Sequence, residues 1–387
     1  MVNIGGAERM TFEVLRTVIR ADGSVMCVVN DWENHRIAAL ATEIGAQFTS
    51  GPYQQPLKRK NVRPSDLLRM SKAILRCSSR LLVVAARFKP THVLIPEIFS
   101  LTMNGPALLA LRAAGVRVIY QMHDTPPQLP SYRRFWRLIG TRLVDQFVCV
   151  SRFVAEELRA TGVAPAKISR IYNTLPTRRP ALAVAGAREL QRIVYVGQFL
   201  PAKGLDVLLD AVALLVARGY DVRLSVIGNA FDWTAPAYES YRRRLLERAK
   251  RPDLAGRVDF LGSRDDVLSV MASAGVHCCP SLPEIREAFG LVVLEAKVSG
   301  LPSVIFPSGG LPELIEDRVD GWISTEISAE GLAEGLEYFI ADPKRTLMAG
   351  EVARKSAERF SLAQFRSEWE QVFGLVPEKV GVEGHAG

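Results

Sequence analysis

The sequence predicts an α/β fold made of two doubly wound domains, and three observations lead to this prediction. The chain has 387 residues, which is too long for one ordinary domain and suits two. Short apolar runs alternate with amphipathic segments, and this alternation occurs twice along the chain. The periodicity breaks between residues 175 and 188, where prolines, arginines and small residues interrupt it. Apolar strands that alternate with helices indicate parallel sheets covered on both faces.

In the first half of the chain, short runs rich in β-branched and other apolar residues predict strands. Helix-like sequence separates each run from the next, including residues 11–20 and 153–159. The expected strands cover residues 24–30, 92–95, 116–122 and 146–150.

The second half repeats the pattern with five strand-like runs, and amphipathic segments such as 205–217 and 238–250 lie between them. From residue 325 to about 373 the pattern is helical, and a glycine-rich tail follows. We therefore expect an N-terminal domain over 1–175, a linker over 176–190, a C-terminal domain over 191–359 and a last helix over 360–376. The five expected strands cover residues 192–196, 222–227, 258–261, 276–279 and 303–306.

The composition excludes several classes of protein. Apolar residues form 48% and charged residues 23% of the chain, which excludes a long disordered chain. No apolar run approaches the roughly 18 residues that a spanning helix needs, and no signal-peptide pattern opens the chain. The five cysteines are unevenly spaced, which favours buried thiols in a reducing compartment. Neither cysteine nor histidine has metal-ligand spacing, so we expect no metal site. The thiols and the lack of a signal-peptide pattern lead us to expect a cytoplasmic protein.

Charge is unevenly distributed. The formal net charge is +8, but residues 1–176 hold 24 Lys and Arg against 12 Asp and Glu, whereas residues 191–387 hold 22 against 28. A dense basic stretch over residues 58–89 is interleaved with leucines, and residues 132–137 mix arginine with aromatic side chains. This pattern favours peripheral contact with an anionic membrane. The alternative is a solvated helix face with one buried stripe. A nucleic-acid partner is not expected, since no recognition module is present.

Residues at the carboxyl ends of the predicted strands are the informative ones, because ligands of such sheets bind there. The strand over 192–196 runs into a segment that contains Gly197, Gln198, Lys203 and Gly204. Glycines let the backbone approach a ligand, and a lysine can pair with phosphate. The helix over 205–217 would add its N-terminal dipole. The alternative is a simple strand–helix loop, and neither a GxGxxG fingerprint nor a P-loop is present.

A stronger signal follows the strand over 276–279. Glu287 and Glu295 are eight positions apart, and Phe289 and Gly290 open a helix between them. A helix carboxylate can accept bonds from two sugar hydroxyls, and the amides at a helix start can meet a phosphate. Two glutamates at this spacing often occur by chance, so the information lies in the whole string and its place after a strand.

Seven motifs are spread over almost the entire chain, and they are Gly5-Gly6-Ala7-Glu8-Arg9, His123-Asp124, Gly197 to Gly204, Val226-Ile227-Gly228, Val258 to Gly262, Glu287 to Glu295 and Gly309-Gly310-Leu311-Pro312-Glu313. In this order, the motifs together resemble the retaining glycosyltransferases of family 4, which have the two-domain GT-B fold.

The resemblance implies roles for single residues. Gly5 and Gly6 match the glycine loop near the donor phosphates, and His123 matches the histidine beside the transferred sugar. Lys203 matches the lysine that neutralises the diphosphate, and Gln198 stands in a second donor-phosphate position. In the string after the fourth strand of the second domain, Glu287 matches a glutamate near the sugar, Glu295 the ribose-binding glutamate, and Phe289, Gly290 and Leu291 the loop whose amides meet the donor.

For the whole chain, the resemblance implies transfer from a nucleotide sugar, most often a UDP sugar, without a metal and with the anomeric configuration kept. The basic N-terminal domain would be the acceptor side, and the last helix would cross back to it. The expected acceptor is lipid-linked or a cell-envelope saccharide. The alternatives are a catalytically weak sugar-nucleotide-binding relative and a nucleotide-sugar epimerase of the same fold.

Two departures from the family pattern matter. The glycine loop begins at residue 5, which leaves no room for the strand that should precede it. We therefore expect that the true start lies upstream or that the chain is truncated. The other departure is Gln198, where the family often has an arginine as a second phosphate clamp. Glutamine offers only a neutral hydrogen bond, which bears on donor affinity.

Overall fold

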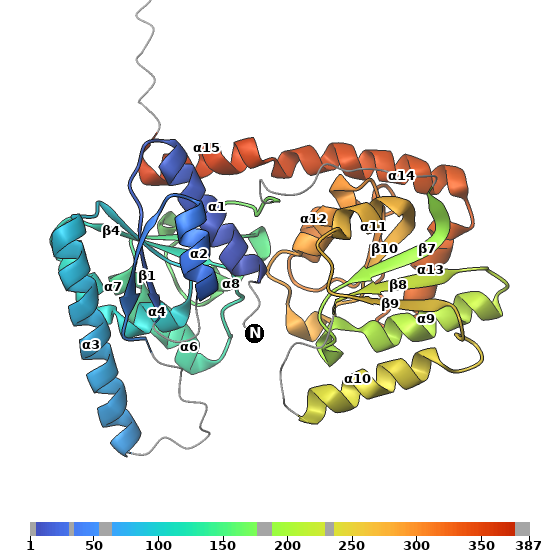
Figure 1. Cartoon of the computed structure of the whole chain (residues 1–387), viewed down its shortest axis with the longest axis horizontal. Coiled ribbons are helices and arrows are strands. Elements are labelled where there is room, and N and C mark those ends of the chain that lie inside the picture. The colour runs from blue at the N-terminus through green and yellow to red at the C-terminus, as the bar shows by residue number, and fades with distance from the viewer. Residues whose placement is uncertain (1–4, 31–34, 54–63, 176–187, 229–235, 376–387) are drawn as a thin grey trace, which may run out of the picture. The chain divides into compact units, whose positions relative to one another are not determined.

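A computed structural model gives the fold and describes residues 5–30, 35–53, 64–175, 188–228 and 236–375. The chain divides into two compact units. The N-terminal unit consists of Val2–Val150, Ala155–Tyr172 and Leu362–Gly387, and the C-terminal unit of Ser151–Val154 and Asn173–Ser361. Each unit is a parallel α/β structure (Figure 1). Most of the expected linker lies outside the described residues.

Within its described residues the N-terminal unit holds two parallel sheets. Strand β1 (Met26–Asn30) pairs with β2 (Gln47–Gly51). A separate sheet has the order β3 (His92–Ile95), β4 (Arg117–Met122), β5 (Gln146–Cys149) and β6 (Ile168–Arg170). We expected that no strand precedes the glycine loop at residue 5. Residues 1–4, which precede this loop, lie outside the described residues. The helices are α1 (Gly6–Arg20), α2 (His35–Glu43), α3 (Pro64–Phe88), α4 (Ile98–Met103), α5 (Gly105–Ala113), α6 (Pro130–Phe135), α7 (Thr141–Leu143) and α15 (Leu362–Phe373), with the short turns η1 (Trp136–Gly140) and η2 (Pro165–Lys167). Helix α8 (Arg152–Ala160) belongs to this unit from Ala155 onward.

Helix α15 completes the core of the N-terminal unit, although it is made from the end of the chain. It packs on α1 and buries four side chains, and Trp369 stacks on Phe373 with ring centroids 5.7 Å apart. Burial of two aromatic rings contributes several kcal/mol, in order of magnitude. The cluster consists of Phe365, Trp369, Val372 and Phe373 with Val14, Ile119, Val148 and Ile171.

The C-terminal unit is built on one parallel sheet of six strands. The sheet order is β12 (Gly321–Ile323), β11 (Ser303–Ile305), β10 (Ala274–Cys279), β7 (Glu189–Val196), β8 (Arg223–Ile227) and β9 (Val258–Gly262). The chain begins in the middle at β7, proceeds outward through β8 and β9, and then returns to β10. The strand order therefore reverses between β7 and β10, which is where open α/β sheets bind ligands. The helices are α9 (Leu205–Ala217), α10 (Pro236–Ala249), α11 (Val267–Ser273), α12 (Leu291–Val298), α13 (Ala329–Ile340) and α14 (Pro343–Ser356), with the 3₁₀ turns η3 (Pro201–Lys203), η4 (Pro283–Ile285), η5 (Leu311–Leu314) and η6 (Ala357–Phe360).

A buried ion pair ties this unit together beside the apolar core. Lys297 in α12 donates to Asp320, with the two charged atoms 2.5 Å apart and both side chains inaccessible. Asp320 also accepts from the Ser356 hydroxyl and from the backbone amide of Glu316, each at 2.8 Å. These extra donors offset the desolvation of the carboxylate, because a buried charge needs full hydrogen bonding.

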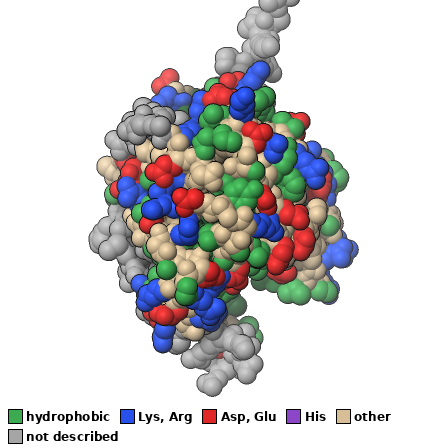
Figure 2. Space-filling view, turned by 90° about the vertical axis from the view of Figure 1, so that its right-hand side faces the viewer, with side chains coloured by type: hydrophobic (Ala, Val, Ile, Leu, Met, Phe, Trp, Pro, Cys, Tyr) green, Lys and Arg blue, Asp and Glu red, His purple; other side chains and the backbone are tan. Residues whose placement is uncertain are grey.

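Outside the core, Figure 2 shows one face of the molecule on which acidic and basic side chains are interspersed. All five cysteines are free thiols, and four of them are buried. In the described part of the chain, no helix is long and apolar enough to cross a membrane.

The predicted fold class is confirmed, but three of the strands were not predicted from the sequence. The short strands β2, β6 and β12 have sequences QFTSG, ISR and GWI, which carry too few apolar residues to stand out. The region after residue 325 consists of three separate helices with breaks at 341–342 and 357–361.

Candidate active site

The two loops that leave β7 and β10 meet at the point where the strand order reverses. After β7, the chain passes through η3, and Gly204 then opens α9 with a φ of +66°. A side chain at Gly204 would lie 2.1 Å from the carbonyl oxygen of Pro280, in the loop after β10. The amide of Leu282 in that loop donates to the Ala202 carbonyl at 2.9 Å. Only glycine permits this approach, so the helix start and the β10 loop lie together.

Lys203 and Glu287 come from these two loops and contact each other directly. The ammonium of Lys203 lies 2.5 Å from Oε1 of Glu287, and both side chains keep about a fifth of their surface exposed, 23% and 18%. The same Oε1 accepts a hydrogen bond from the Ser281 hydroxyl at 2.6 Å. A lysine and a carboxylate thus share one site at the ends of two central strands.

The backbone of Glu287 is held as firmly as its side chain. Its carbonyl accepts from the Gly310 amide at 2.7 Å, and its amide lies 3.4 Å from the Ser308 hydroxyl. Gly309, at φ +57°, passes so close that an added Cβ would lie 2.1 Å from the Glu287 carbonyl oxygen. The loop after β11 therefore fixes where Glu287 lies.

Helix α12 begins directly after this loop, at Leu291. Gly290 is the N-cap residue with φ +105°, and no side chain caps the helix start. Phe289 is buried and meets Phe360 edge to face at 5.7 Å between ring centroids. Glu295 is only 6% exposed, in the second turn of the helix. Since the first amides of a helix point along its axis, this start is suited to an anion.

Gln198 lies two residues after the end of β7, where the family resemblance implied a second donor contact. It is half-buried, and its backbone carbonyl accepts a hydrogen bond from the buried Tyr195 hydroxyl at 2.9 Å. This bond anchors the loop, and the neutral amide side chain adds no charge to the site.

In the N-terminal unit, His123 lies at the end of β4 and is held by α1. Its Nε2 atom is 3.1 Å from the Thr11 hydroxyl, which also lies 3.1 Å from Oε1 of Gln121. A chain in which Nε2–H donates to Thr11 and Thr11 donates to Gln121 satisfies all three groups. Burial lowers the pKa of His123 to about 4, so the imidazole is neutral at pH 7.

Gly5 and Gly6 stand at the start of the same helix, α1, with Gly5 as its N-cap residue. Thus α1 carries both the predicted glycine loop and the hydroxyl that holds His123. Gly5, Gly6 and His123 belong to the N-terminal unit, and the other predicted site residues belong to the C-terminal unit.

Two residues of this arrangement were missed by sequence reasoning. Ser281 contacts Glu287, and Thr11 contacts His123. Ser281 lies two residues after the end of β10, so its position at a strand end was a usable signal. Thr11 lies inside a helix, and no spacing rule pointed to it. Among the described residues, no group of three His, Cys, Asp or Glu side chains is placed to hold a metal ion.

The basic and aromatic stretch over residues 132–137 differs from its predicted role. Tyr132 is exposed, but the side chain of Trp136 is only 2% exposed and packs edge to face on Tyr120 and Phe147. The expectation that this tryptophan contacts a membrane is wrong, because its ring is part of the core. Residues 58–60 and 63 of the other basic stretch lie outside the described residues.

Comparisons with known proteins agree with this architecture. The fold is that of the GT-B glycosyltransferases: HepE of Anabaena, solved with UDP-glucose, has a TM-score of 0.75 at 20% identity and covers 97% of both chains. The lipopolysaccharide outer core galactosyltransferase WaaB has a TM-score of 0.67 at 17% identity and covers 97% of this chain and 98% of its own.

Family models match both units. The model described as Glycosyltransferase Family 4 matches residues 4–179, and that described as Glycosyl transferases group 1 matches residues 185–356. The chain belongs to glycosyltransferase family 4, as its motifs predicted.

Two curated relatives illustrate the sequence similarity. The D-inositol 3-phosphate glycosyltransferase of Corynebacterium aurimucosum is 31% identical over 188 residues, which cover 47% of this chain and 42% of that protein. The phosphatidyl-myo-inositol mannosyltransferase of Mycolicibacterium smegmatis is 28% identical over 275 residues, 70% of this chain and 66% of its own. The chain thus spans less than two thirds of the length of either relative.

Proposed function

We propose that this protein is a retaining, metal-independent glycosyltransferase that moves a sugar from a nucleotide-sugar donor to a lipid-linked or cell-envelope saccharide acceptor. The observation that carries the proposal is the meeting of Lys203 and Glu287 between β7 and β10, beside the starts of α9 and α12. Membership of family 4 supports it.

The chemistry of transfer explains why these groups belong at this point. When the bond between the anomeric carbon and the diphosphate breaks, the bonding electrons leave with the diphosphate oxygen. The acceptor oxygen forms the new bond to the anomeric carbon, and its proton passes to a phosphate oxygen. Lys203 and the helix-start amides at Gly290 and Leu291 would stabilise the charge that develops on the leaving group.

The remaining predicted residues would bind and orient the donor. Glu295 would accept the ribose hydroxyls, and Glu287 would lie against the transferred sugar. From the N-terminal unit, Gly5 and Gly6 would approach the phosphates, and neutral His123 would face the sugar. A neutral imidazole suits this role because it accepts or donates a hydrogen bond without adding charge.

The donor nucleotide is proposed to be UDP, which HepE, a protein of the same fold, binds. The test is thermal unfolding with UDP, GDP and ADP, on wild type and on Lys203→Ala. A ligand of the folded state raises the melting temperature by mass action. We expect UDP to raise it and Lys203→Ala to abolish the rise. If no nucleotide stabilises a folded protein, the proposed donor site is wrong.

We also propose that the protein acts in the cytoplasm at the inner face of the membrane. The excess of Lys and Arg in residues 1–176 supports contact with an anionic surface. The name of one relative, phosphatidyl-myo-inositol mannosyltransferase, supports a lipid acceptor. Transfer assays with lipid-linked and water-soluble acceptors would decide between the two acceptor classes.

One observation favours a second candidate, a sugar-nucleotide-binding relative with weak activity. Gln198 supplies no positive charge, so the diphosphate would meet one cation fewer from the loop after β7. Replacing Gln198 with arginine discriminates between the two functions. If wild type binds UDP but gains transfer activity only as Gln198→Arg, the weak relative is correct. An epimerase of the same fold would convert the nucleotide sugar without any acceptor.

A further inference from the structure

Helix α3 presents an unusual outer face to solvent. It runs from Pro64 to Phe88, and three of its leucines, Leu68, Leu75 and Leu82, are 59%, 62% and 38% exposed. They are seven residues apart, so they lie along one line that drifts by only about 20° per step. Figure 1 shows α3 as a long helix in blue. A continuous line of exposed leucines on a soluble unit indicates a binding surface.

The inner face of α3 packs on the rest of its unit. The leucines are therefore exposed on a helix that is already packed on its other side. Cys77, Ser78 and Ala85 are buried, and the Ser78 hydroxyl donates to the Met103 carbonyl at 3.3 Å. Near the middle of the helix, Arg80 donates through Nε to the Ser50 carbonyl in β2 at 2.9 Å. These contacts hold α3 on its unit, with the three leucines on the outer side of the helix.

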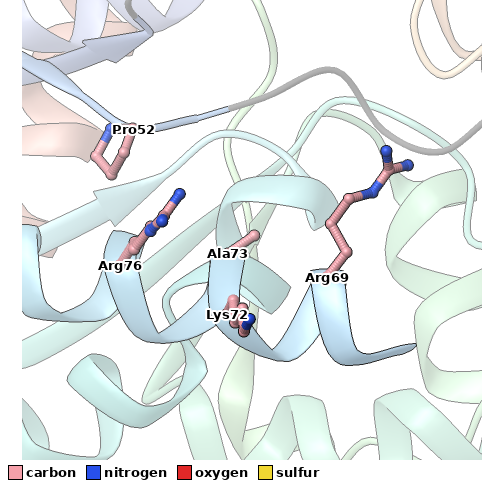
Figure 3. Close-up of a pocket in the computed structure, with 5 residues that line it drawn as sticks. All are labelled: Pro52, Arg69, Lys72, Ala73 and Arg76. Atoms are coloured by element: carbon pink, nitrogen blue, oxygen red, sulfur yellow. The ribbon is translucent and has the colours of Figure 1, made fainter. Parts of the chain in front are cut away.

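A basic ridge runs beside the leucine line. Arg69, Lys72 and Arg76 are spaced by three and four residues, which places them on one side of the helix. They line a surface pocket of about 190 Å³ with Ala73 of the same helix and Pro52, which follows β2 (Figure 3). None of the three cations forms an ion pair with another described residue, so the pocket carries unneutralised positive charge.

We propose that α3 lies in the surface of an anionic membrane, with Leu68, Leu75 and Leu82 among the acyl chains, and that the Arg69–Lys72–Arg76 pocket binds the phosphate of a phospholipid headgroup that has a net negative charge. An apolar line flanked by cations matches the layering of a bilayer, in which phosphates lie just outside the acyl chains. A protein partner would have to match both the leucines and three unpaired cations. The inference rests on the proposed membrane association and does not depend on sugar transfer.

The test uses sedimentation of the full chain with vesicles. The vesicles contain phosphatidylcholine alone, phosphatidylcholine with phosphatidylglycerol, or phosphatidylcholine with a carboxylate lipid at equal charge. We expect binding to the phosphatidylglycerol vesicles above all. If the carboxylate vesicles bind equally well, the phosphate pocket is wrong, because charge alone would then explain the attraction.

Three variants divide the proposal into its parts. Arg69→Gln/Lys72→Gln/Arg76→Gln removes the cations and should weaken binding about 100-fold, since each surface cation contributes about fivefold. Leu68→Ser/Leu75→Ser/Leu82→Ser should abolish the fraction of binding that survives high salt. Ala73→Met fills the pocket and keeps every charge, and it should weaken binding to phosphatidylglycerol but not to the carboxylate lipid.

A matched control removes three arginines elsewhere. Arg242, Arg243 and Arg244 in α10 are exposed, and their replacement with glutamine changes the net charge equally. If this control loses as much binding as the α3 variant, α3 is not the membrane site. If the leucine variant binds vesicles normally but changes oligomeric state on gel filtration, the leucines cover a second copy and the proposal is overturned.

The proposal can fail separately from the proposed function. Stabilisation by UDP reports the donor site, whereas sedimentation reports α3. A protein that binds vesicles through α3 but is not stabilised by UDP would contradict sugar transfer alone. A protein stabilised by UDP that ignores vesicles would contradict the membrane inference alone, and equal melting temperatures of wild type and variants would verify that each variant folds.

Discussion

The ammonium of Lys203 and the carboxylate of Glu287 lie 2.5 Å apart, from loops that follow two different strands of the C-terminal sheet. Without a ligand, the lysine proposed to bind a diphosphate is therefore already paired with a carboxylate. A diphosphate would have to compete with Glu287 for this cation or share it.

The first prediction follows from this competition. Glu287→Gln removes the competing negative charge, so UDP should bind several-fold more tightly while the transfer rate falls by about 100-fold. Isothermal titration with UDP and a radiolabelled transfer assay measure the two quantities. Weaker UDP binding in this variant would mean that Glu287 assists the diphosphate instead of competing with it.

The second prediction concerns Ser281, whose hydroxyl donates to Oε1 of Glu287 at 2.6 Å. Ser281→Ala should lower kcat by about tenfold with little change in KM for the donor, because it frees the carboxylate to turn. Ser281→Thr keeps a hydroxyl and should restore part of the rate. A fall in melting temperature without any change in kcat would make Ser281 purely structural.

A third prediction uses pH and His277, which is buried in β10 with Nδ1 at 3.0 Å from the Ser303 hydroxyl. Burial lowers its pKa from 6.5 to about 3, so between these values the unfolded chain binds a proton that the folded chain excludes. This contribution to stability is full above pH 6.5 and is lost as the pH falls. At pH 5 the unfolding free energy should be lower by about 2 kcal/mol.

Urea unfolding at pH 7.5 and pH 5 measures this change. In His277→Gln the loss between the two pH values should shrink by about the same 2 kcal/mol. His123, with its pKa lowered to about 4, also makes the unfolding free energy decrease as the pH falls. If His277→Gln shows the same difference in unfolding free energy between pH 7.5 and pH 5 as wild type, His277 does not titrate in this range.

The fourth prediction concerns Gly309. A Cβ at this position would lie 2.1 Å from the Glu287 carbonyl oxygen, and φ is +57°. Gly309→Ala should cost about 2–4 kcal/mol in unfolding free energy and also abolish UDP binding, because Glu287 is displaced. Gly219→Ala is the matched control, with φ +92° and no atom within 4 Å of the added Cβ. It should cost about 1 kcal/mol and leave UDP binding intact.

Much of the C-terminal unit was predictable from sequence. Helix α9 has the expected bounds because eleven of its thirteen residues are apolar and Gly204 marks its start. The loops at Lys203 and Glu287 were found from their position after strands. The contact between them was not predictable, because it depends on the order β10-β7-β8, which brings two strands distant in sequence side by side.

The limits of prediction are clearest in short elements and in side-chain partners. Strand β12 has only three residues, and its pairing with β11 defines it more than its composition does. The stretch over residues 132–137 was expected at a membrane surface because it mixes arginine with aromatic side chains, yet Trp136, in the π-helical turn η1, is buried in the core. Sequence neighbours reveal little about direction when a helix changes its hydrogen-bond spacing.

The position of α15 has a consequence for synthesis on the ribosome. Most proteins fold their first domain while later ones are still being made. Here the core around Val14, Ile119 and Val148 lacks Trp369 and Phe373 until residues 362–373 have left the ribosome. The C-terminal unit, whose residues end at Ser361, can therefore close before the N-terminal unit is complete. A nascent chain would expose the apolar surface that α15 covers until this helix emerges, and a chaperone that shields apolar surfaces could bind there until then.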